Sequence, residues 1–163
     1  MDLVNLDTIY VSLVNHDLRY DISALIKSFY NNVNIIFLEE QALDENQSLF
    51  IESILMQNKA ITRMLKNGQV VEEFEDNIDT IDIKVDDRYK IEKMGIKKSL
   101  FSLLSKVTNT KVPWGVLTGI RPTKIVHNLL DNNFDDETIE HILTREYKLN
   151  IDKASLIIDI AKR

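Results

Sequence analysis

Four residues in the last third of the chain have side chains suited to holding an anion or another protein surface: Trp114, Thr118, Arg121 and Lys124. Pro122 lacks an amide hydrogen and suits the first turn of a helix, so Arg121 and Lys124 stand at a predicted helix start. Free amide groups there attract phosphate or carboxylate. The segment lacks the Gly-x4-Gly-Lys-Ser/Thr spacing of a phosphate loop. Arg121 and Lys124 could thus bind an anion, but such cations more commonly pair with acidic groups elsewhere in the same polypeptide. We therefore predict either an anion site or an interdomain contact for these four residues.

The residue types needed for covalent, redox or metal chemistry are scarce. The chain has no cysteine, which excludes disulfides, thiolate metal sites, thiol catalysis and an iron–sulfur cluster bound within it. The histidines are His16, His127 and His141, and none has a second histidine or a carboxylate at metal-site spacing apart from helix-surface neighbours such as Glu137 and His141. Paired carboxylates occur at predicted element ends and loops, where capping and solubility explain them. We therefore predict no catalytic residue, no cofactor-binding residue and no metal ligand in this chain.

Composition is that of a globular protein, with 163 residues, 44% hydrophobic and 28% charged. No apolar run approaches the roughly 20 residues that a membrane span needs, so we expect no membrane partner. The net charge of −6 argues against a nucleic-acid or anionic-membrane partner. Met1 is followed by acidic and polar residues rather than a basic and apolar leader, so we expect a cytoplasmic protein.

The first two thirds of the chain alternate between strand-like and helix-like patterns. The predicted strands are residues 7–14, 33–38, 49–56, 60–66 and 69–74, and the predicted helices are residues 18–30 and 86–107. Asp17 is a candidate cap for the first helix. The second strand is apolar enough to be central in a sheet. Gly95 lies inside the second helix, where it marks a bend or a close contact.

The dipeptide Asn67-Gly68 is the strongest hairpin signal, because both turn positions favour positive φ. It favours two strands on either side of it. The alternative for residues 48–66 is one long helix, and periodicity alone leaves this alternative open. The acidic stretch 76–85 is predicted to be irregular.

The last third of the chain has three helix candidates. The first is residues 122–130, the second starts after a cap at Asp135 or Asp136, and the third follows Asn150. The apolar pattern does not fade before Arg163, so we expect the chain to be cut shortly after, or within, its last helix. The fold class predicted is α+β, with an antiparallel sheet and two covering helices in residues 1–110. A small three-helix segment, residues 111–163, follows as a connector to a catalytic domain absent from this chain.

Charge changes sign along the chain. Acidic residues dominate residues 72–92, whereas residues 93–124 contain seven cations and no acid. A basic helix of this kind more commonly forms a solvated face or docks onto an acidic segment, here residues 72–92. The alternative function is a free-standing module that uses the basic stretch 93–124 to bind RNA or a protein. An RNA-binding sheet would need exposed aromatic residues on central strands, and the strand 49–56 offers only Phe50.

A family resemblance rests on the segment Trp-Gly-Val-Leu-Thr-Gly-Ile-Arg-Pro-Thr-Lys at residues 114–124, followed by His127. It resembles the N-terminal region of oxygen-independent coproporphyrinogen III oxidase-like proteins, also called coproporphyrinogen dehydrogenases, of the radical SAM superfamily. The Glu-His-Ile-Leu-x3-Tyr pattern at residues 140–147 and Lys153-Ala154 are similar as well. Residues 1–110 match only in general layout.

The resemblance implies a parent enzyme that oxidatively decarboxylates two propionates of coproporphyrinogen III, giving protoporphyrinogen IX in haem synthesis. Such enzymes hold a [4Fe–4S] cluster on a Cys-x3-Cys-x2-Cys motif and bind S-adenosylmethionine. Because this chain has no cysteine, no catalytic residue of the family transfers to it. The resemblance therefore implies a non-catalytic N-terminal region, whose partner is the C-terminal radical SAM domain of the same polypeptide.

Overall fold

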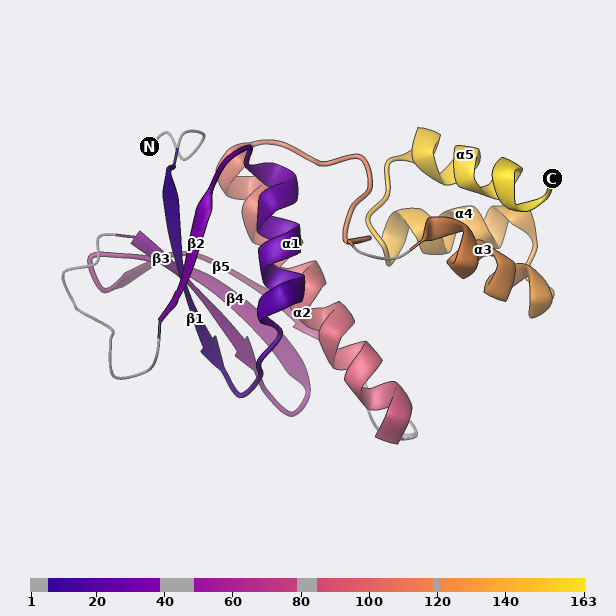
Figure 1. The fold of residues 1–163 in the computed structure, drawn as a ribbon. Coiled ribbons are helices and arrows are strands. Elements are labelled where there is room, and N and C mark those ends of the chain that lie inside the picture. The colour runs from indigo at the N-terminus through magenta and orange to yellow at the C-terminus, as the bar shows by residue number, and fades with distance from the viewer. Residues whose placement is uncertain (1–5, 39–48, 79–84, 119–120) are drawn as a thin grey trace. The chain divides into compact units, whose positions relative to one another are not determined.

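The chain forms two compact units, Met1–Thr110 and Lys111–Arg163 (Figure 1). The computed structural model describes residues 6–38, 49–78, 85–118 and 121–163, with the backbone alone at residues 85 and 86. In the first unit the elements are β1 Thr8–Val14, α1 Arg19–Phe29, β2 Asn34–Leu38, β3 Leu49–Leu55, β4 Lys59–Lys66, β5 Gln69–Asn77 and α2 Val85–Thr108. Every strand and helix predicted in this part of the sequence is present, and the long-helix alternative for residues 48–66 is wrong.

The five strands form one sheet in the order β2-β1-β3-β4-β5. The pairs β3–β4 and β4–β5 are antiparallel as predicted, but β1 runs parallel to both β2 and β3. The α+β class is thus confirmed, and the sheet is mixed rather than wholly antiparallel. Strands β1 and β2 are parallel because α1 returns the chain to the starting end of β1 before β2 begins.

Strand β2 was predicted to be central and is at the edge of the sheet, so that prediction is wrong. Its residues Asn34 and Ile36 are exposed, whereas Ile35 and Phe37 are partly buried. The strand is apolar because one of its faces packs on the core. It is nevertheless an edge strand, because it pairs with β1 alone. An apolar run does not distinguish these two situations.

The β4–β5 hairpin turns at Asn67 and Gly68, whose φ angles are +51° and +77°. Positive φ at both turn residues is the geometry that matches the twist of the two strands, and the predicted turn is confirmed. Strand β5 continues to Asn77, three residues beyond its predicted end. Part of the acidic stretch predicted to be irregular is therefore paired with β4.

Both helices of the first unit pack on the same face of the sheet (Figure 1). The buried Thr62 of β4 and Ser99 of α2 share a hydrogen bond of 2.8 Å between hydroxyl oxygens. Phe29 and Phe101 pack edge to face, with ring centroids 5.5 Å apart, and join the two helices. The largest fully buried side chains of this core are Val11, Ile22, Leu25, Ile26, Ile51, Ile96, Leu100, Leu103 and Leu104. Burial of each such side chain contributes about 1.5–3 kcal/mol of transfer free energy.

Gly95 lets α2 approach the end of β5 and the start of β4. A Cβ at this position would lie 2.9 Å from Ile78 Cγ1 and 3.5 Å from Ala60 Cβ. The predicted close contact at this glycine is confirmed. By contrast, the predicted cap at Asp17 is wrong: Leu18 is the N-cap residue of α1, and Asp17 pairs with Arg19 at 2.8 Å.

The second unit contains three helices, α3 Pro122–Asp131, α4 Asp136–Arg145 and α5 Ile151–Ala161. Pro122 begins α3, as predicted. Asp135 Oδ1 accepts from the Thr138 amide at 2.8 Å, and Asn150 Oδ1 accepts from the Asp152 amide at the same distance. The cap predicted at Asp135 or Asp136 is confirmed at Asp135, and Asn150, after which the third helix was predicted to begin, is the N-cap of α5. The core of this unit is formed by Leu117, Val126, Ile139, Leu143, Leu149, Ala154, Ile157 and Ile158.

Candidate functional site

The turn that carries Trp114 is held against the loop between α4 and α5. The Val116 amide donates to the Tyr147 carbonyl at 2.9 Å, and the Asn150 amide donates to the Pro113 carbonyl at 2.9 Å. Between these two bonds, Gly115 has φ +57°, and a Cβ there would lie 2.5 Å from the Lys148 carbonyl oxygen. Only glycine fits such a close backbone approach. The turn is therefore positioned by its backbone, independently of any ligand.

Trp114 is the only tryptophan of the chain, and its side chain is 37% exposed. Lys153 Nζ lies 5.2 Å from the centroid of the indole ring, which is a cation–π distance. The lysine therefore fixes one face of the indole on α5. The two residues are far apart in sequence, and their spacing carried no signal of this pairing.

Thr118 is the last residue of the described range 85–118. Its Oγ1 atom is buried and has no hydrogen-bond partner among the residues that the structure describes. A buried hydroxyl without a partner costs about 1–3 kcal/mol. A role of Thr118 in an anion site or an interdomain contact stays a prediction.

Arg121 and Lys124 occupy the first turn of α3, at the positions predicted from Pro122. Arg121 is the N-cap residue, with extended backbone, and the Lys124 amide donates to its carbonyl at 3.1 Å. Both side chains are exposed. Within the described ranges, neither forms an ion pair or a hydrogen bond through its side chain. Two cations at a helix start thus remain available for an anion or for a carboxylate of another surface, which stays a prediction.

The basic stretch of α2 is largely neutralised by its own unit. Lys93 Nζ lies 3.1 Å from Asp21 Oδ1 on α1, and Lys98 Nζ lies 3.6 Å from Asp76 Oδ2 on β5. Lys97 is only 2% exposed, and burial lowers the pKa of its amine. The contact between Lys98 and Asp76 is the docking onto the acidic stretch that the sequence indicates. These three lysines do not form a solvated basic face for RNA.

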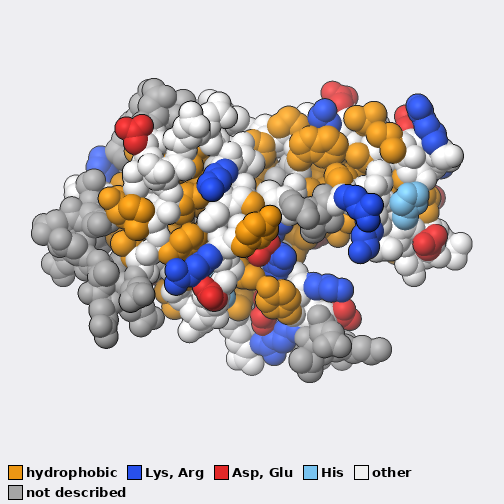
Figure 2. Space-filling model, viewed as in Figure 1, with side chains coloured by type: hydrophobic (Ala, Val, Ile, Leu, Met, Phe, Trp, Pro, Cys, Tyr) orange, Lys and Arg blue, Asp and Glu red, His pale blue; other side chains and the backbone are white. Residues whose placement is uncertain are grey.

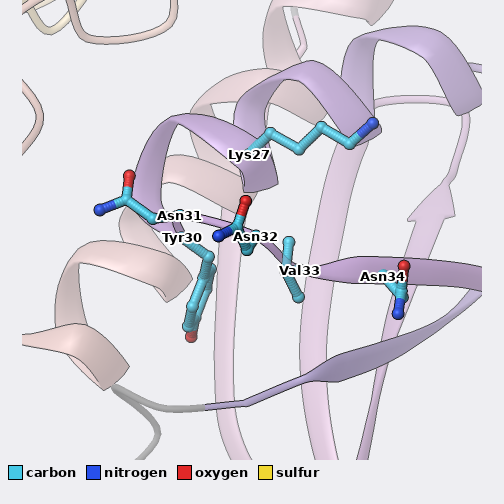
Figure 3. Close-up of a pocket in the computed structure, with 6 residues that line it drawn as sticks. All are labelled: Lys27, Tyr30, Asn31, Asn32, Val33 and Asn34. Atoms are coloured by element: carbon cyan, nitrogen blue, oxygen red, sulfur yellow. The ribbon is translucent and has the colours of Figure 1, made fainter.

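The larger hollow described in the first unit lies at the C-terminal end of α1 and has a volume of about 660 Å³. It is lined by Lys27, Tyr30, Asn31, Asn32, Val33 and Asn34. Figure 3 shows that these side chains diverge, with Lys27, Tyr30 and Asn31 each pointing in a different direction. Ligand sites need polar groups that converge, so the hollow has the geometry of an open surface.

A second hollow, of about 350 Å³, lies beside His16 at the ends of β1 and β3. His16 Nε2 lies 3.0 Å from Ser53 Oγ, and its Nδ1 accepts from the Leu18 amide at 3.2 Å. Since Nδ1 accepts, the proton of the neutral ring is on Nε2, which then donates to Ser53 and is no base for it. Ser53 is fully buried. The pair, which sequence spacing did not reveal, therefore ties the start of α1 to β3.

Burial lowers the pKa of His16 below its ordinary value of 6.5, against weaker opposing effects of the Ser53 backbone carbonyl, 3.2 Å from Nε2, and of the Asp17 charge. The neutral ring is thus the form that the fold holds.

Over the described ranges, no group of three or more His, Asp or Glu side chains is arranged to bind a metal ion. No described helix is long and apolar enough to cross a membrane.

Comparison with known proteins gives one relevant similarity. No protein-family profile matches the chain, and no solved structure matches it significantly. The chain is 32% identical, over 82 residues, to the oxygen-independent coproporphyrinogen-III oxidase-like protein HemZ of Bacillus subtilis strain 168. The match covers 50% of this chain and 16% of HemZ. The chain is thus partly similar to a coproporphyrinogen oxidase-like protein and spans a small part of its length.

Proposed function

We propose that the chain is the non-catalytic N-terminal region of a radical SAM oxidoreductase that resembles oxygen-independent coproporphyrinogen III oxidase. The similarity to HemZ is the observation that carries this proposal. The parent protein would act in the cytoplasm on coproporphyrinogen III during porphyrin and haem synthesis. Its partner would be the radical SAM domain of the same polypeptide.

The residues of this chain do not fit the cofactors that the proposal implies. A [4Fe–4S] cluster that binds S-adenosylmethionine needs thiolate ligands, and the chain has no cysteine. The cluster and its chemistry therefore belong to residues outside these 163. What remains for this chain is to support or cover the domain that holds them.

The segment 114–124 supplies the contact in this proposal. Its turn is closely packed against the loop between α4 and α5, since Gly115 has no room for a side chain, and its tryptophan is partly exposed and contacts Lys153. Arg121 and Lys124 add two cations without partners in the described part of the chain. Such a preorganised surface is suited to a carboxylate, either of a neighbouring domain or of a substrate propionate.

The experiment that tests the proposal starts from the complete reading frame that encodes this chain. The product is expressed without oxygen, reconstituted with iron and sulfide, and assayed for 5′-deoxyadenosine formation with coproporphyrinogen III. Formation of 5′-deoxyadenosine together with protoporphyrinogen supports the proposal. A cluster without turnover of this substrate refutes the haem assignment, and a reading frame that encodes no cysteine motif refutes the radical SAM assignment.

A second assay separates the two roles of the cations. In the active protein, Arg121→Gln with Lys124→Gln raises KM for coproporphyrinogen at unchanged kcat if the cations hold a propionate. If they contact another domain, KM stays constant and the double variant is released from that domain more readily in salt. Lys106→Gln, an exposed lysine of α2, is the matched control for loss of positive charge.

A further inference from the structure

Helix α5 is apolar around most of its circumference. Ala154, Ile157 and Ile158 are buried in the core of the second unit. Leu156 and Ile160 are apolar too, yet 44% and 47% of their surfaces are exposed. A helix that is apolar on nearly all sides is typical of an element covered on more than one face. The core of the second unit covers only one of them.

Apart from Ile151 at the first helical position, the exposed apolar residues of α5 lie in one row. Lys153, Leu156 and Ile160 are spaced by three and four residues, so they follow one another along the same side of the helix. Trp114 extends this row, because its ring packs against Lys153. We call these four residues the α5 stripe. Figure 2 shows hydrophobic side chains on the surface of this part of the second unit.

The polar residues of α5 occupy a different side. Asp152, Ser155 and Asp159 are exposed, and their spacing by three and four residues places them together on one narrow side. These three residues form the water-facing side of the helix, and the stripe is a separate, apolar side. Scattered exposed leucines are ordinary, but a continuous row ending in an ordered tryptophan is typical of a contact surface.

We infer that the α5 stripe docks against the domain that follows these residues in the longer polypeptide, an inference that rests on the proposed function. The matched region makes up only 16% of HemZ, so most of a HemZ-like protein lies outside it. A polypeptide that continues past Arg163 leaves α5 two residues after its last helical residue, where the Arg163 amide donates to the Ile160 carbonyl at 3.3 Å. A tethered domain reaches the stripe at high effective concentration, and its docking surface would be an apolar patch.

The test compares hydrogen exchange of the α5 amides in the 163-residue chain and in the product of the complete reading frame. Exchange at residues 153–160 should be slower by at least about tenfold in the longer protein. Leu156→Glu should abolish that difference. Ile151→Glu is the matched control: it replaces an aliphatic residue that is 58% exposed on the same helix but outside the stripe, and it should leave the slowing intact.

The outcomes distinguish the inference from the proposed function. Equal exchange in the two proteins overturns the docking, while cluster formation and S-adenosylmethionine cleavage by the same sample still support the proposed function. Slowing that survives Leu156→Glu also overturns it. If hydrogen exchange at residues 153–160 slows in the 163-residue chain by itself as its concentration rises, the stripe binds a second copy of the chain and the inference is refuted. Circular dichroism of both variants checks that the helix content of the wild-type protein is retained.

Discussion

Replacing Gly115 by alanine should destabilise the second unit far more than replacing a glycine with open space around it. Gly115 has φ +57°, a left-handed conformation that costs an alanine about 1–2 kcal/mol. The new Cβ would also lie far inside contact distance of the Tyr147 carbonyl oxygen and 2.5 Å from that of Lys148. These are backbone atoms, so the turn and the loop must separate.

Separation weakens two backbone hydrogen bonds of 2.9 Å, from Val116 to Tyr147 and from Asn150 to Pro113. Each contributes about 0.5–1.5 kcal/mol, so the total loss is about 2–5 kcal/mol. Typical domain stabilities are about 5–15 kcal/mol, which makes this a large fraction for a small unit. Urea unfolding followed by Trp114 fluorescence reports the loss, since the only tryptophan lies in this unit.

Gly68→Ala is the matched control. Gly68 has φ +77°, and no atom lies within 4 Å of the place that a Cβ would take, so its replacement costs the conformational strain alone. It lies in the first unit and should leave the fluorescence transition unchanged, while a small loss appears in the circular dichroism transition. If Gly115→Ala costs no more than Gly68→Ala, the steric reasoning about the turn is wrong.

Three further predictions concern the first unit. Gly95→Ala should lower the free energy of unfolding by about 1–2 kcal/mol, because the new Cβ would lie 2.9 Å from Ile78 Cγ1 and the isoleucine must move away. An unchanged urea midpoint would contradict the close contact. His16 has a lowered pKa in the fold, so its stabilisation is complete above pH 6.5 and is lost as pH falls through the folded pKa. The urea midpoint should therefore drop between pH 7 and pH 5, and His16→Gln should flatten that drop; an equal drop in the variant would refute the role of this ring. Lys97→Met keeps the buried stem and removes the charge whose pKa burial lowers, so the melting temperature should rise by a few degrees, as for a gain of about 1 kcal/mol. A lower melting temperature would mean that the interaction with Asp21 outweighs desolvation.

The local elements of this fold were predictable because their signals are local. Asn67-Gly68 specifies its own turn through positive φ, and Asp135 and Asn150 provide the hydrogen bonds that begin α4 and α5. Gly95 was recognised for the same reason, since a glycine inside a helix needs an explanation. Such signals depend on the residue and its near neighbours, and the tertiary fold leaves them unchanged.

Pairings between distant segments were not predictable. Strand β2 is apolar whether it lies at the centre or the edge of the sheet, and the parallel partner of β1 depends on where α1 returns the chain. At the candidate site, Pro122 located Arg121 and Lys124 at a helix start. The cation–π contact of Trp114 joins segments that only the tertiary fold brings together. No spacing in the sequence encodes it.

The most direct test of the account is the iron and sulfide content after anaerobic reconstitution of two products, the 163-residue chain and its complete reading frame. The account predicts that the complete product binds about four iron atoms per chain and turns brown, as a [4Fe–4S] protein does. It also predicts that the short chain, which has no cysteine, stays colourless. A complete product that binds no iron, or a short chain that holds a stable cluster, would contradict it.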